Sequence, residues 1–284
     1  MNPTDIDTLR ARLREIAAIP YARWTGDLPE RKREELAFHD RDRDRSRMES
    51  LDRKDFDRYY GNRKYYAGTA RSRAYVDTWI AAHAGGRVFL DYACGNGGYA
   101  IRAARAGAAL SVGIDLSPVS IENARRDAEE QALSDSTFFV VADAENTLLP
   151  ESSIDVVICS GMLHHLDLSY AFPELRRILK PGGRILAVEA LDYNPAIKLY
   201  RFLTPQMRTE WEKRHILTLK DLAFAERFFA VGEVRYWHIA SILGAYFPRA
   251  LPALDAVDRL LTRLPLVKRM AWTFTFELIK RDGG

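Results

Sequence analysis

The sequence predicts an α/β fold with a parallel sheet at its centre. Between residues 85 and 190, short apolar runs alternate with segments of helical periodicity, which is the pattern of βαβ units. The first of these runs ends in Asp91 and passes through a small loop that holds Gly95 and Gly97, before a helical pattern begins at Tyr99. A strand, a tight turn and a helix N-terminus in this order let the backbone approach a nucleotide-like ligand closely.

The strands of this sheet are predicted from apolar, β-branched segments, five within the alternating region and two after it. The helix after the first strand is expected to end at Gly107, and the next helix is expected to be capped by Ser117 with Pro118 at its first position. The Pro-Gly-Gly within residues 180–183 predicts a turn before the fifth strand. The predicted strands are Arg87–Tyr92, Leu110–Asp115, Thr137–Val141, Ile154–Cys159, Arg184–Ala190, Gly232–His238 and Trp272–Ile279.

Residues 1–80 are predicted to form a helical, highly charged lid or cap segment, which precedes the sheet-containing domain of residues 81–284. Residues 31–47 alternate in charge, a pattern typical of a solvated helix face or a mobile segment. A group of tyrosines follows just before the sheet, where it would either cover a bound ligand or pack in the ordinary way. These tyrosines are Tyr59, Tyr60, Tyr65 and Tyr66.

Two segments near 191–221 and 239–270 interrupt the sheet pattern and are interpreted as helical insertions that cap the sheet. Their aromatic content predicts a pocket for an apolar or ring-bearing molecule, although helices that pack on a sheet would have the same composition. The stretch 254–272 combines apolar residues with Arg and Lys, which suits either packing on the sheet or contact with a membrane surface. The predicted substrate contacts are Tyr66, Tyr193, Trp211 and His238.

Composition narrows the class of protein. A net charge of +3 is too small by itself to indicate nucleic-acid binding. Cys94 and Cys159 have no CxxC or Cys/His spacing, so no metal site is predicted, and two lone cysteines suit a reducing cytoplasm. The N-terminus lacks the apolar core of a signal peptide, and no window approaches the roughly 18 apolar residues of a spanning helix. We therefore expect a cytoplasmic protein that acts on a small molecule; a homodimer is compatible with the sequence.

The glycine loop alone does not identify its ligand. Gly95, Gly97 and Ala100 fit the dinucleotide pattern G-x-G-x-x-A, and Asp115 lies where that pattern expects an acid for the ribose. The same arrangement suits either a nicotinamide cofactor or S-adenosylmethionine. Small residues could also serve only to let the helix pack closely on the strand.

Further motifs distinguish these alternatives. Asp91 closely precedes the loop, Asp115 ends the second strand in GIDLS, and Asp143 follows the third strand in VVADAE. The fourth strand continues into CSGMLHHL, and LKPGGRIL precedes the fifth. With these motifs, residues 85–190 resemble the class I S-adenosylmethionine-dependent methyltransferases, most closely the small-molecule group often called type 11. The resemblance implies a Rossmann-like, mostly parallel seven-stranded sheet with an antiparallel last strand.

The resemblance implies a role for each matching residue. Asp91 corresponds to the acid near the methionine part of the donor, Asp115 to the carboxylate that accepts from the ribose hydroxyls, and Asp143 to the residue that meets the adenine amine. The family usually has glycine where this chain has Ala93, which is small enough for the loop to form. The implied donor contacts are Asp91, Ala93, Gly95, Gly97, Asp115, Leu116, Asp143, Ala144 and Ser160.

The implied chemistry is methyl transfer from S-adenosylmethionine, which leaves S-adenosylhomocysteine. The enzyme has to align a nucleophile with the sulfonium methyl group, and a general base helps where the acceptor must lose a proton. His165 and His164 follow the fourth strand and are the candidates for the base or for a group that orients the acceptor. The alternative is that this His pair is a loop feature shared by enzymes with different acceptors.

We therefore expect methylation of an oxygen or nitrogen atom on a small metabolite that is apolar or aromatic. Sulfur and carbon acceptors remain open within the same fold. An RNA or protein acceptor is disfavoured by the near-neutral charge and by the lack of an Asn-Pro-Pro-Tyr type motif after the fourth strand. A nicotinamide-dependent oxidoreductase is favoured by the glycine pattern alone. A silent fold used only for binding would lose the donor contacts, whose positions are all filled here.

Overall fold

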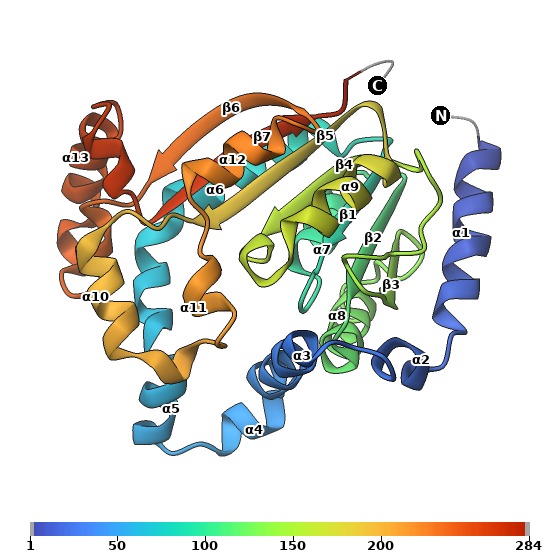
Figure 1. Cartoon of the computed structure of the whole chain (residues 1–284), viewed down its shortest axis with the longest axis horizontal. Helices are drawn as coiled ribbons and strands as arrows, with labels where there is room; N and C mark the ends of the chain where they lie inside the picture. Colours follow the sequence, from blue (N-terminus) through green and yellow to red (C-terminus); the bar gives the residue numbers. More distant parts are fainter. Residues whose placement is uncertain (1–2, 282–284) are drawn as a thin grey trace.

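The computed structural model describes residues 3–281 and has a seven-stranded sheet at its centre (Figure 1). The strand order is β3-β2-β1-β4-β5-β7-β6, and β7 lies antiparallel between β5 and β6 while the first five strands are parallel. This arrangement confirms the predicted fold. The strands are β1 Val88–Tyr92, β2 Leu110–Asp115, β3 Thr137–Val141, β4 Ile154–Ser160, β5 Leu179–Ala190, β6 Ala230–Trp237 and β7 Thr273–Ile279.

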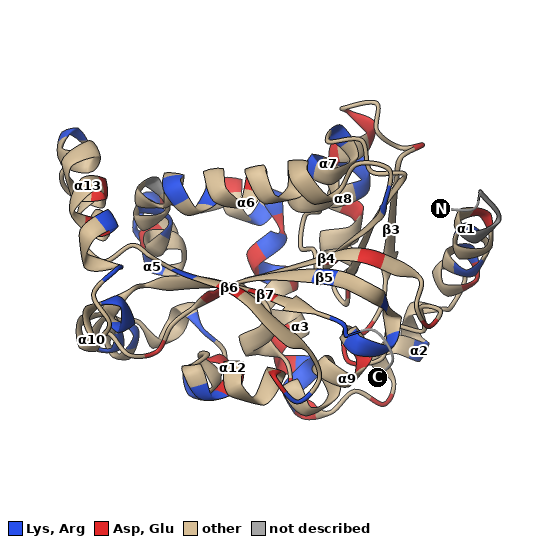
Figure 2. Cartoon of the chain, turned by 90° about the horizontal axis from the view of Figure 1, so that it is seen from above, with Lys and Arg blue, Asp and Glu red and all other residues tan. Residues whose placement is uncertain are grey.

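The central strands are apolar because helices cover both of their faces. Every residue of β1 is buried, and successive side chains of a strand point to opposite faces. Phe89 therefore packs in one apolar cluster with Val76 and Ile80, whereas Leu90 packs in another with Phe172 and Leu175. In Figure 2, α6, α7 and α8 lie on one side of the sheet and α9 and α12 on the other. These helices are α6 Ala70–His83, α7 Gly98–Arg105, α8 Pro118–Glu129, α9 Leu168–Ile178 and α12 Leu219–Ala225.

The predicted turn at residues 180–183 is part of β5. Its pairing with β4 shifts register between Ile154 and Val156, which accommodates the additional residues as an irregularity in the strand. Gly182 has a φ of 70°, and its backbone N–H donates to the carbonyl of Lys280 at 3.0 Å. The turn therefore begins the strand and does not precede it, because its backbone still pairs with neighbouring segments.

The N-terminal helices run past the edge strand and then across the carboxyl ends of the parallel strands (Figure 1). Leu9, Leu13 and Ile16 of the first helix are buried in the main apolar cluster. The charged third helix is not a solvated face, since Lys32 and Glu35 are buried. The elements are α1 Pro3–Ala17, α2 Tyr21–Thr25, α3 Glu30–Arg43, α4 Arg45–Ser50, α5 Arg53–Tyr60 and the 3₁₀ segment η1 Gly61–Thr69.

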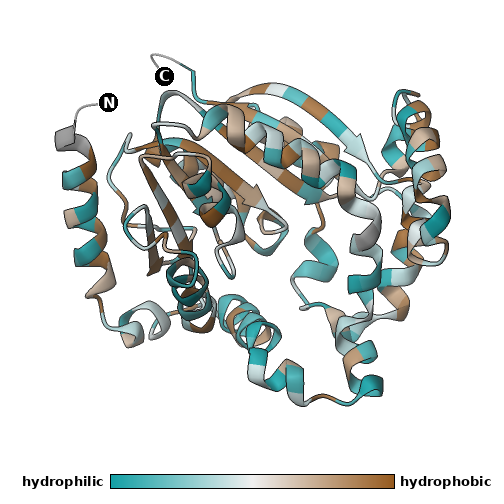
Figure 3. Ribbon diagram, turned by 180° about the vertical axis from the view of Figure 1, so that it is seen from behind, coloured by the Kyte–Doolittle hydropathy of each residue, from teal (hydrophilic) through white to brown (hydrophobic). Residues whose placement is uncertain are grey.

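The two segments that follow β5 and β6 are helical, as the sequence predicts. No helix in residues 3–281 is long and apolar enough to cross a membrane. In Figures 1 and 3, α10 and α13 lie at the same end of the molecule, away from α1. The elements are α10 Pro195–Leu203, η3 Pro205–Met207 and α11 Glu212–His215 after β5, and η4 Ser241–Ala245, η5 Pro248–Ala250, α13 Leu251–Leu261 and η6 Val267–Met270 after β6.

Candidate functional site

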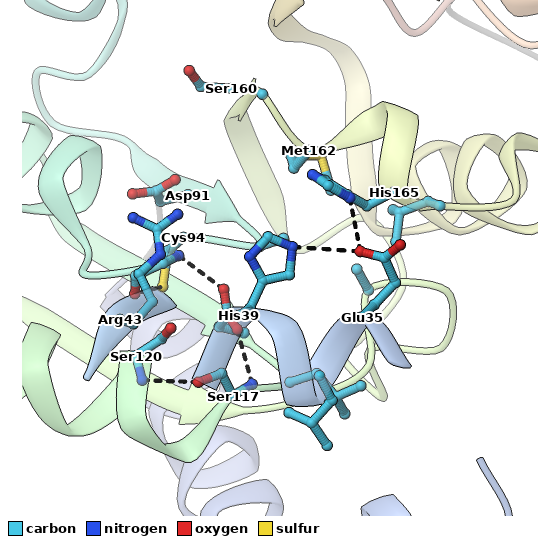
Figure 4. Close-up of a pocket in the computed structure, with 18 of the residues that line it drawn as sticks. Glu35, His39, Arg43, Asp91, Cys94, Ser117, Ser120, Ser160, Met162 and His165 are labelled. Carbon is cyan, nitrogen blue, oxygen red and sulfur yellow. Dashed lines mark hydrogen bonds and ion pairs between the residues drawn. The ribbon is translucent and has the colours of Figure 1, made fainter. Parts of the chain in front are cut away.

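A cavity of about 380 Å³ lies at the carboxyl ends of the first parallel strands, between these ends and α3 (Figure 4). Open α/β sheets bind ligands at this edge, and the volume is within the usual range for small-molecule sites. All the predicted donor contacts except Gly97 line the cavity. These lining residues are Asp91, Ala93, Gly95, Asp115, Leu116, Asp143, Ala144 and Ser160.

The glycine loop turns through three left-handed backbone positions. Ala93 has a φ of 54°, Gly95 of 51° and Gly97 of 72°, a conformation that glycine adopts without strain and alanine does not. Gly97 serves packing, because a Cβ atom there would lie 2.5 Å from the Phe139 ring and 2.8 Å from the Ala124 side chain. The glycine thus brings the start of α7 onto β3 and α8 and does not itself face the cavity.

Asp91 connects the end of β1 to the start of α7. Its Oδ2 atom accepts backbone hydrogen bonds from Tyr99 at 3.2 Å and Ala100 at 3.0 Å, the donors that a helix N-terminus leaves unpaired. Burial raises the pKa of Asp91 to about 7, although the two backbone hydrogen bonds oppose this shift. The carboxyl group therefore changes its charge near neutral pH at the wall of the cavity.

Asp115 and Asp143 are fixed by short loops at the ends of β2 and β3. The two Asp115 oxygens accept from the backbone N–H groups of Gly95 and Ser117, each at 2.8 Å. Asp143 accepts from the backbone N–H of Glu145 at 2.9 Å and pairs with Lys32 at 2.5 Å. Both carboxylates are thereby held in one orientation at the cavity wall.

The N-terminal half of α3 is attached to the cavity wall by ion pairs. Lys32 reaches Glu145 at 2.8 Å as well as Asp143, and Arg31 pairs with Glu145 at 2.8 Å. Arg31 also donates to the backbone carbonyl of His165 at 3.0 Å. The sequence gives little sign of this contact, because the partners are more than 100 residues away along the chain.

The C-terminal half of α3 is attached to the glycine loop and to α8. Asp40 accepts a hydrogen bond from the Ser117 hydroxyl, and the Arg43 carbonyl accepts from Asn123 at 3.0 Å. The Arg43 guanidinium lies against the backbone at Gly95 (Figure 4). The charged segment that the sequence indicates as solvated therefore forms one wall of the cavity.

A Glu–His group from α3 and the loop after β4 lies at the other end of this wall (Figure 4). The Glu35 Oε2 atom is 2.8 Å from His165 Nδ1 and 3.5 Å from His39 Nε2, and Thr209 donates to the other Glu35 oxygen. Burial would raise the pKa of Glu35, but the His165 and His39 imidazoles close to its carboxylate hold it well below its usual value. Glu35 is therefore an anion that can hold the neighbouring His165 imidazole in one orientation.

Among the described residues, two groups of three side chains could offer ligand atoms to a metal ion, and both include His165. One is Glu35, His39 and His165; the other is His164, His165 and Glu212. In the first group the carboxylate already pairs with both imidazoles. The atoms that could bind an ion are therefore the same atoms that face one another in these pairs.

His164 has a different place from His165. It is buried outside the cavity lining, and its Nδ1 atom lies 2.7 Å from Glu189 Oε2. Burial lowers the pKa of His164, but Glu189 outweighs that effect and raises it above its usual value. The other Glu189 oxygen accepts from the backbone N–H groups of Met162 and Leu163 at 2.9 and 2.8 Å. This pair therefore shapes the loop that carries His165.

The four predicted substrate contacts do not line the cavity. His238 is buried, with its ring nitrogens 2.8 Å from the Ser72 hydroxyl and 2.9 Å from the Ser241 hydroxyl, and burial lowers its pKa to about 4. Although His238 follows β6, its imidazole does not reach the cavity. Both of its ring nitrogens have hydroxyl partners, one on α6 and one in η4, the segment before α13.

The other three predicted contacts are aromatic residues with partners of their own. Trp211 stacks on His215 at 3.6 Å and receives the Arg31 guanidinium at 4.4 Å, so it supports α3 from outside the cavity. The remaining two are Tyr193, which accepts from the backbone N–H of Leu219, and Tyr66, whose ring lies 5.6 Å from that of Trp272.

Residues 90–187 match a family model described as a methyltransferase domain. The 27-O-demethylrifamycin SV methyltransferase of Amycolatopsis mediterranei is 39% identical over 107 residues, which are 37% of this chain and 39% of that protein. The ubiquinone/menaquinone biosynthesis C-methyltransferase UbiE of Acidiphilium cryptum is 38% identical over 36% of this chain and 42% of that protein. The chain thus spans about two fifths of the length of these curated relatives.

Solved structures share the fold at lower identity. A geranyl diphosphate methyltransferase in complex with GPP and sinefungin has a TM-score of 0.55 and 19% identity, over 74% of this chain and 79% of that one. The [4+2]-cyclase SpnF has a TM-score of 0.54 and 22% identity, over 75% and 82%. The family match thus identifies residues 90–187 as a methyltransferase domain, and the strand order of the whole sheet is compatible with the class I S-adenosylmethionine-dependent type.

Proposed function

We propose that the chain binds S-adenosylmethionine in the cavity below α3 and transfers its methyl group to an oxygen or nitrogen atom of a small, apolar or ring-bearing metabolite. When bound, the donor supplies a methyl group already activated by the sulfonium. The chemical character of the cavity fits this ligand, since fixed carboxylates can accept from ribose hydroxyls and from an adenine amine. In this proposal Asp115 accepts from the ribose and Asp143 from the adenine, with Leu116 and Ala144 beside the base. Asp91 lies near the methionine part.

The observation that carries the choice of acceptor is the pairing of His165 with Glu35 at the cavity wall, at 2.8 Å. A hydroxyl or amine acceptor must lose a proton as it gains the methyl group. With Nδ1 paired to an ionised carboxylate, Nε2 of His165 is the nitrogen available to take that proton. Glu35 then stabilises the imidazolium, as a buried carboxylate does in a catalytic triad. We assign the base to His165 and only a positioning role to His164.

The names of several relatives point to other classes of methyl acceptor, namely carbon atoms and a protein. The UbiE and sterol 24-C-methyltransferase relatives act on carbon by their names, and a ribosomal protein L11 methyltransferase of Pseudomonas aeruginosa is 29% identical over 65% of this chain and 69% of that protein. SpnF is named for a cyclisation, so the fold alone does not decide the reaction. A small acceptor is favoured here because α3 covers the cavity with side chains from both of its ends. A cytoplasmic location stays a prediction, with which the free thiols of Cys94 and Cys159 agree.

The proposal is tested by a screen of small phenols, amines and carboxylic acids with methyl-labelled donor, followed by kinetics of His165→Ala and Glu35→Gln. We expect His165→Ala to lower kcat about 10²–10⁴-fold, the usual contribution of a positioned acid–base group. Donor affinity should change little. His83→Ala, which alters an imidazole on α6 far from the cavity, is the matched control and should keep full activity. Full activity of His165→Ala would refute the assignment of the base.

A further inference from the structure

The apolar side chains left exposed by this fold are concentrated at one end of the molecule. Ten of the thirteen large apolar residues that are exposed in the described part of the chain fall between residues 199 and 266. On α10, Leu199, Phe202 and Leu203 are 58%, 79% and 66% exposed, and their i, i+3, i+4 spacing places them on one side of the helix. This helix therefore turns its apolar stripe towards solvent.

The helix α13 buries an acidic residue fully and leaves several apolar residues exposed. Its only buried residue is Asp258, whose carboxylate accepts from the backbone N–H groups of Ile239, Ala240 and Ser241. Val257 and Leu260 are exposed. Its other leucines are half-buried, so the helix packs only part of its apolar side on this chain and leaves the rest in solvent.

These two helices belong to one surface, which we call the α10–α13 face: α10, η4, η5, α13 and residues 262–270. The Tyr65 ring connects its parts, since it lies 5.4 Å from the ring of Tyr200 on α10 and 6.0 Å from that of Tyr246 after η4. Asn194, the N-cap of α10, donates to the carbonyl of Met270 at 2.7 Å. Figures 1, 2 and 3 show α10 and α13 at the same end of the molecule in three views.

The α10–α13 face is also basic. The whole chain has 42 Lys and Arg residues and 39 Asp and Glu residues. Residues 195–203 and 241–270 together contain seven of these basic residues and two of these acidic residues. Both acids are on α13, and neither is exposed: Asp258 is buried and Asp255 is half-buried. Of the seven cations, Lys198 and Arg201 pair with Asp192 just outside these ranges, whereas Arg249, Arg263 and Arg269 are exposed. The rest of the chain is slightly acidic, so this end differs from it in both charge and hydropathy.

We infer that the α10–α13 face binds the surface of a lipid bilayer that contains anionic headgroups. Exposed aromatic and leucine side chains with arginine beside them are the composition of interfacial helices, which insert their apolar side and hold lipid phosphates with their basic side. A second copy of this chain fits less well, because a symmetric contact would bring this net-basic face against the same net-basic face. The inference stands apart from the reaction, since none of these residues lines the cavity.

The test is co-sedimentation of the full chain with vesicles of phosphatidylcholine alone or mixed equally with phosphatidylglycerol. We expect binding to the anionic vesicles only, weakened by salt. Phe202→Ser with Leu203→Ser should lower the partition coefficient at least about tenfold, because two exposed apolar side chains no longer insert. Arg249→Gln, Arg263→Gln and Arg269→Gln together should lower it roughly a hundredfold on anionic vesicles.

Tyr170→Ser is the matched control, because it removes an aromatic ring that is 62% exposed from α9, outside this face. It should bind vesicles as the wild type does, and all variants should keep the wild-type circular dichroism melting curve. Absence of binding to anionic vesicles at low salt would overturn the inference. So would a stable dimer in light scattering that becomes monomeric in Phe202→Ser with Leu203→Ser, since the face would then be occupied by a second copy.

Discussion

The glycine loop contains two adjacent glycines for which the structure predicts opposite effects of one added methyl group. Gly97 has a φ of 72°, and a Cβ atom there would lie 2.5 Å from the Phe139 ring. Gly98 begins α7 with a negative φ, and a Cβ atom there would have no neighbour within 4 Å. Gly97→Ala and Gly98→Ala therefore form a matched pair.

The expected cost of Gly97→Ala has two parts. An alanine in the left-handed region costs about 1–2 kcal/mol relative to glycine. Carbon atoms in ordinary contact are about 3.5–4.0 Å apart, so the Phe139 ring must move by about 1 Å, and overpacking of this kind costs about 1–3 kcal/mol. The free energy of unfolding should therefore fall by about 2–5 kcal/mol. Gly98→Ala should leave it unchanged or raise it by up to about 1 kcal/mol, because alanine is favoured in helices.

The assay is urea denaturation followed by circular dichroism. Gly97→Ala should lower the midpoint without a change in slope, since the exposed surface on unfolding stays the same. Binding of S-adenosylhomocysteine to the folded fraction should persist, because Gly97 supports the loop by packing. A Gly97→Ala protein as stable as the wild type, or an equal loss in Gly98→Ala, would refute the packing role.

Two further predictions concern charge at the cavity wall. Burial raises the pKa of Asp91 from 3.8 to about 7, so between these pH values the folded protein holds a proton that the unfolded chain releases. The contribution of this group to stability should therefore be lost as the pH rises from about 4 to about 7. The urea midpoint of the wild type should fall over this pH range, and that of Asp91→Asn should fall less. Lys32→Met removes the cation that pairs with Asp143 and one of the two that pair with Glu145, and it should cost about 1–3 kcal/mol of unfolding free energy. Lys213→Met, which removes an exposed pair, should leave the midpoint unchanged.

Strands and loops were predictable because their signals are local. β2 and β3 have the predicted ends, and β1 begins one residue later than predicted, since apolar, β-branched runs between turn residues define a buried parallel strand. Asp91, Asp115 and Asp143 follow successive strands, and parallel strands end at the same edge of the sheet. Their common cavity therefore follows from topology.

The role of α3 was not predictable in this way. Its alternating charges have no apolar stripe, so nothing local marks a buried face. Lys32 and Glu35 are buried by partners that are more than 100 residues away along the chain, including Asp143 and His165. The prediction that His238 contacts the substrate was wrong for the opposite reason. Its place after a strand is a local signal that suggests the site, but its hydrogen bonds to Ser72 and Ser241 depend on the folded structure.

The central claim is that the cavity under α3 is a methyl-donor site, and calorimetry with S-adenosylhomocysteine and NADH tests it most directly. We predict that the wild type binds one S-adenosylhomocysteine per chain and no NADH. Asp115→Ala should weaken this binding at least about tenfold, because one carboxylate no longer accepts from the ribose. Asp115→Asn, which keeps one acceptor oxygen, should lose less. Binding of NADH without S-adenosylhomocysteine, or unchanged affinity in Asp115→Ala, would contradict the account.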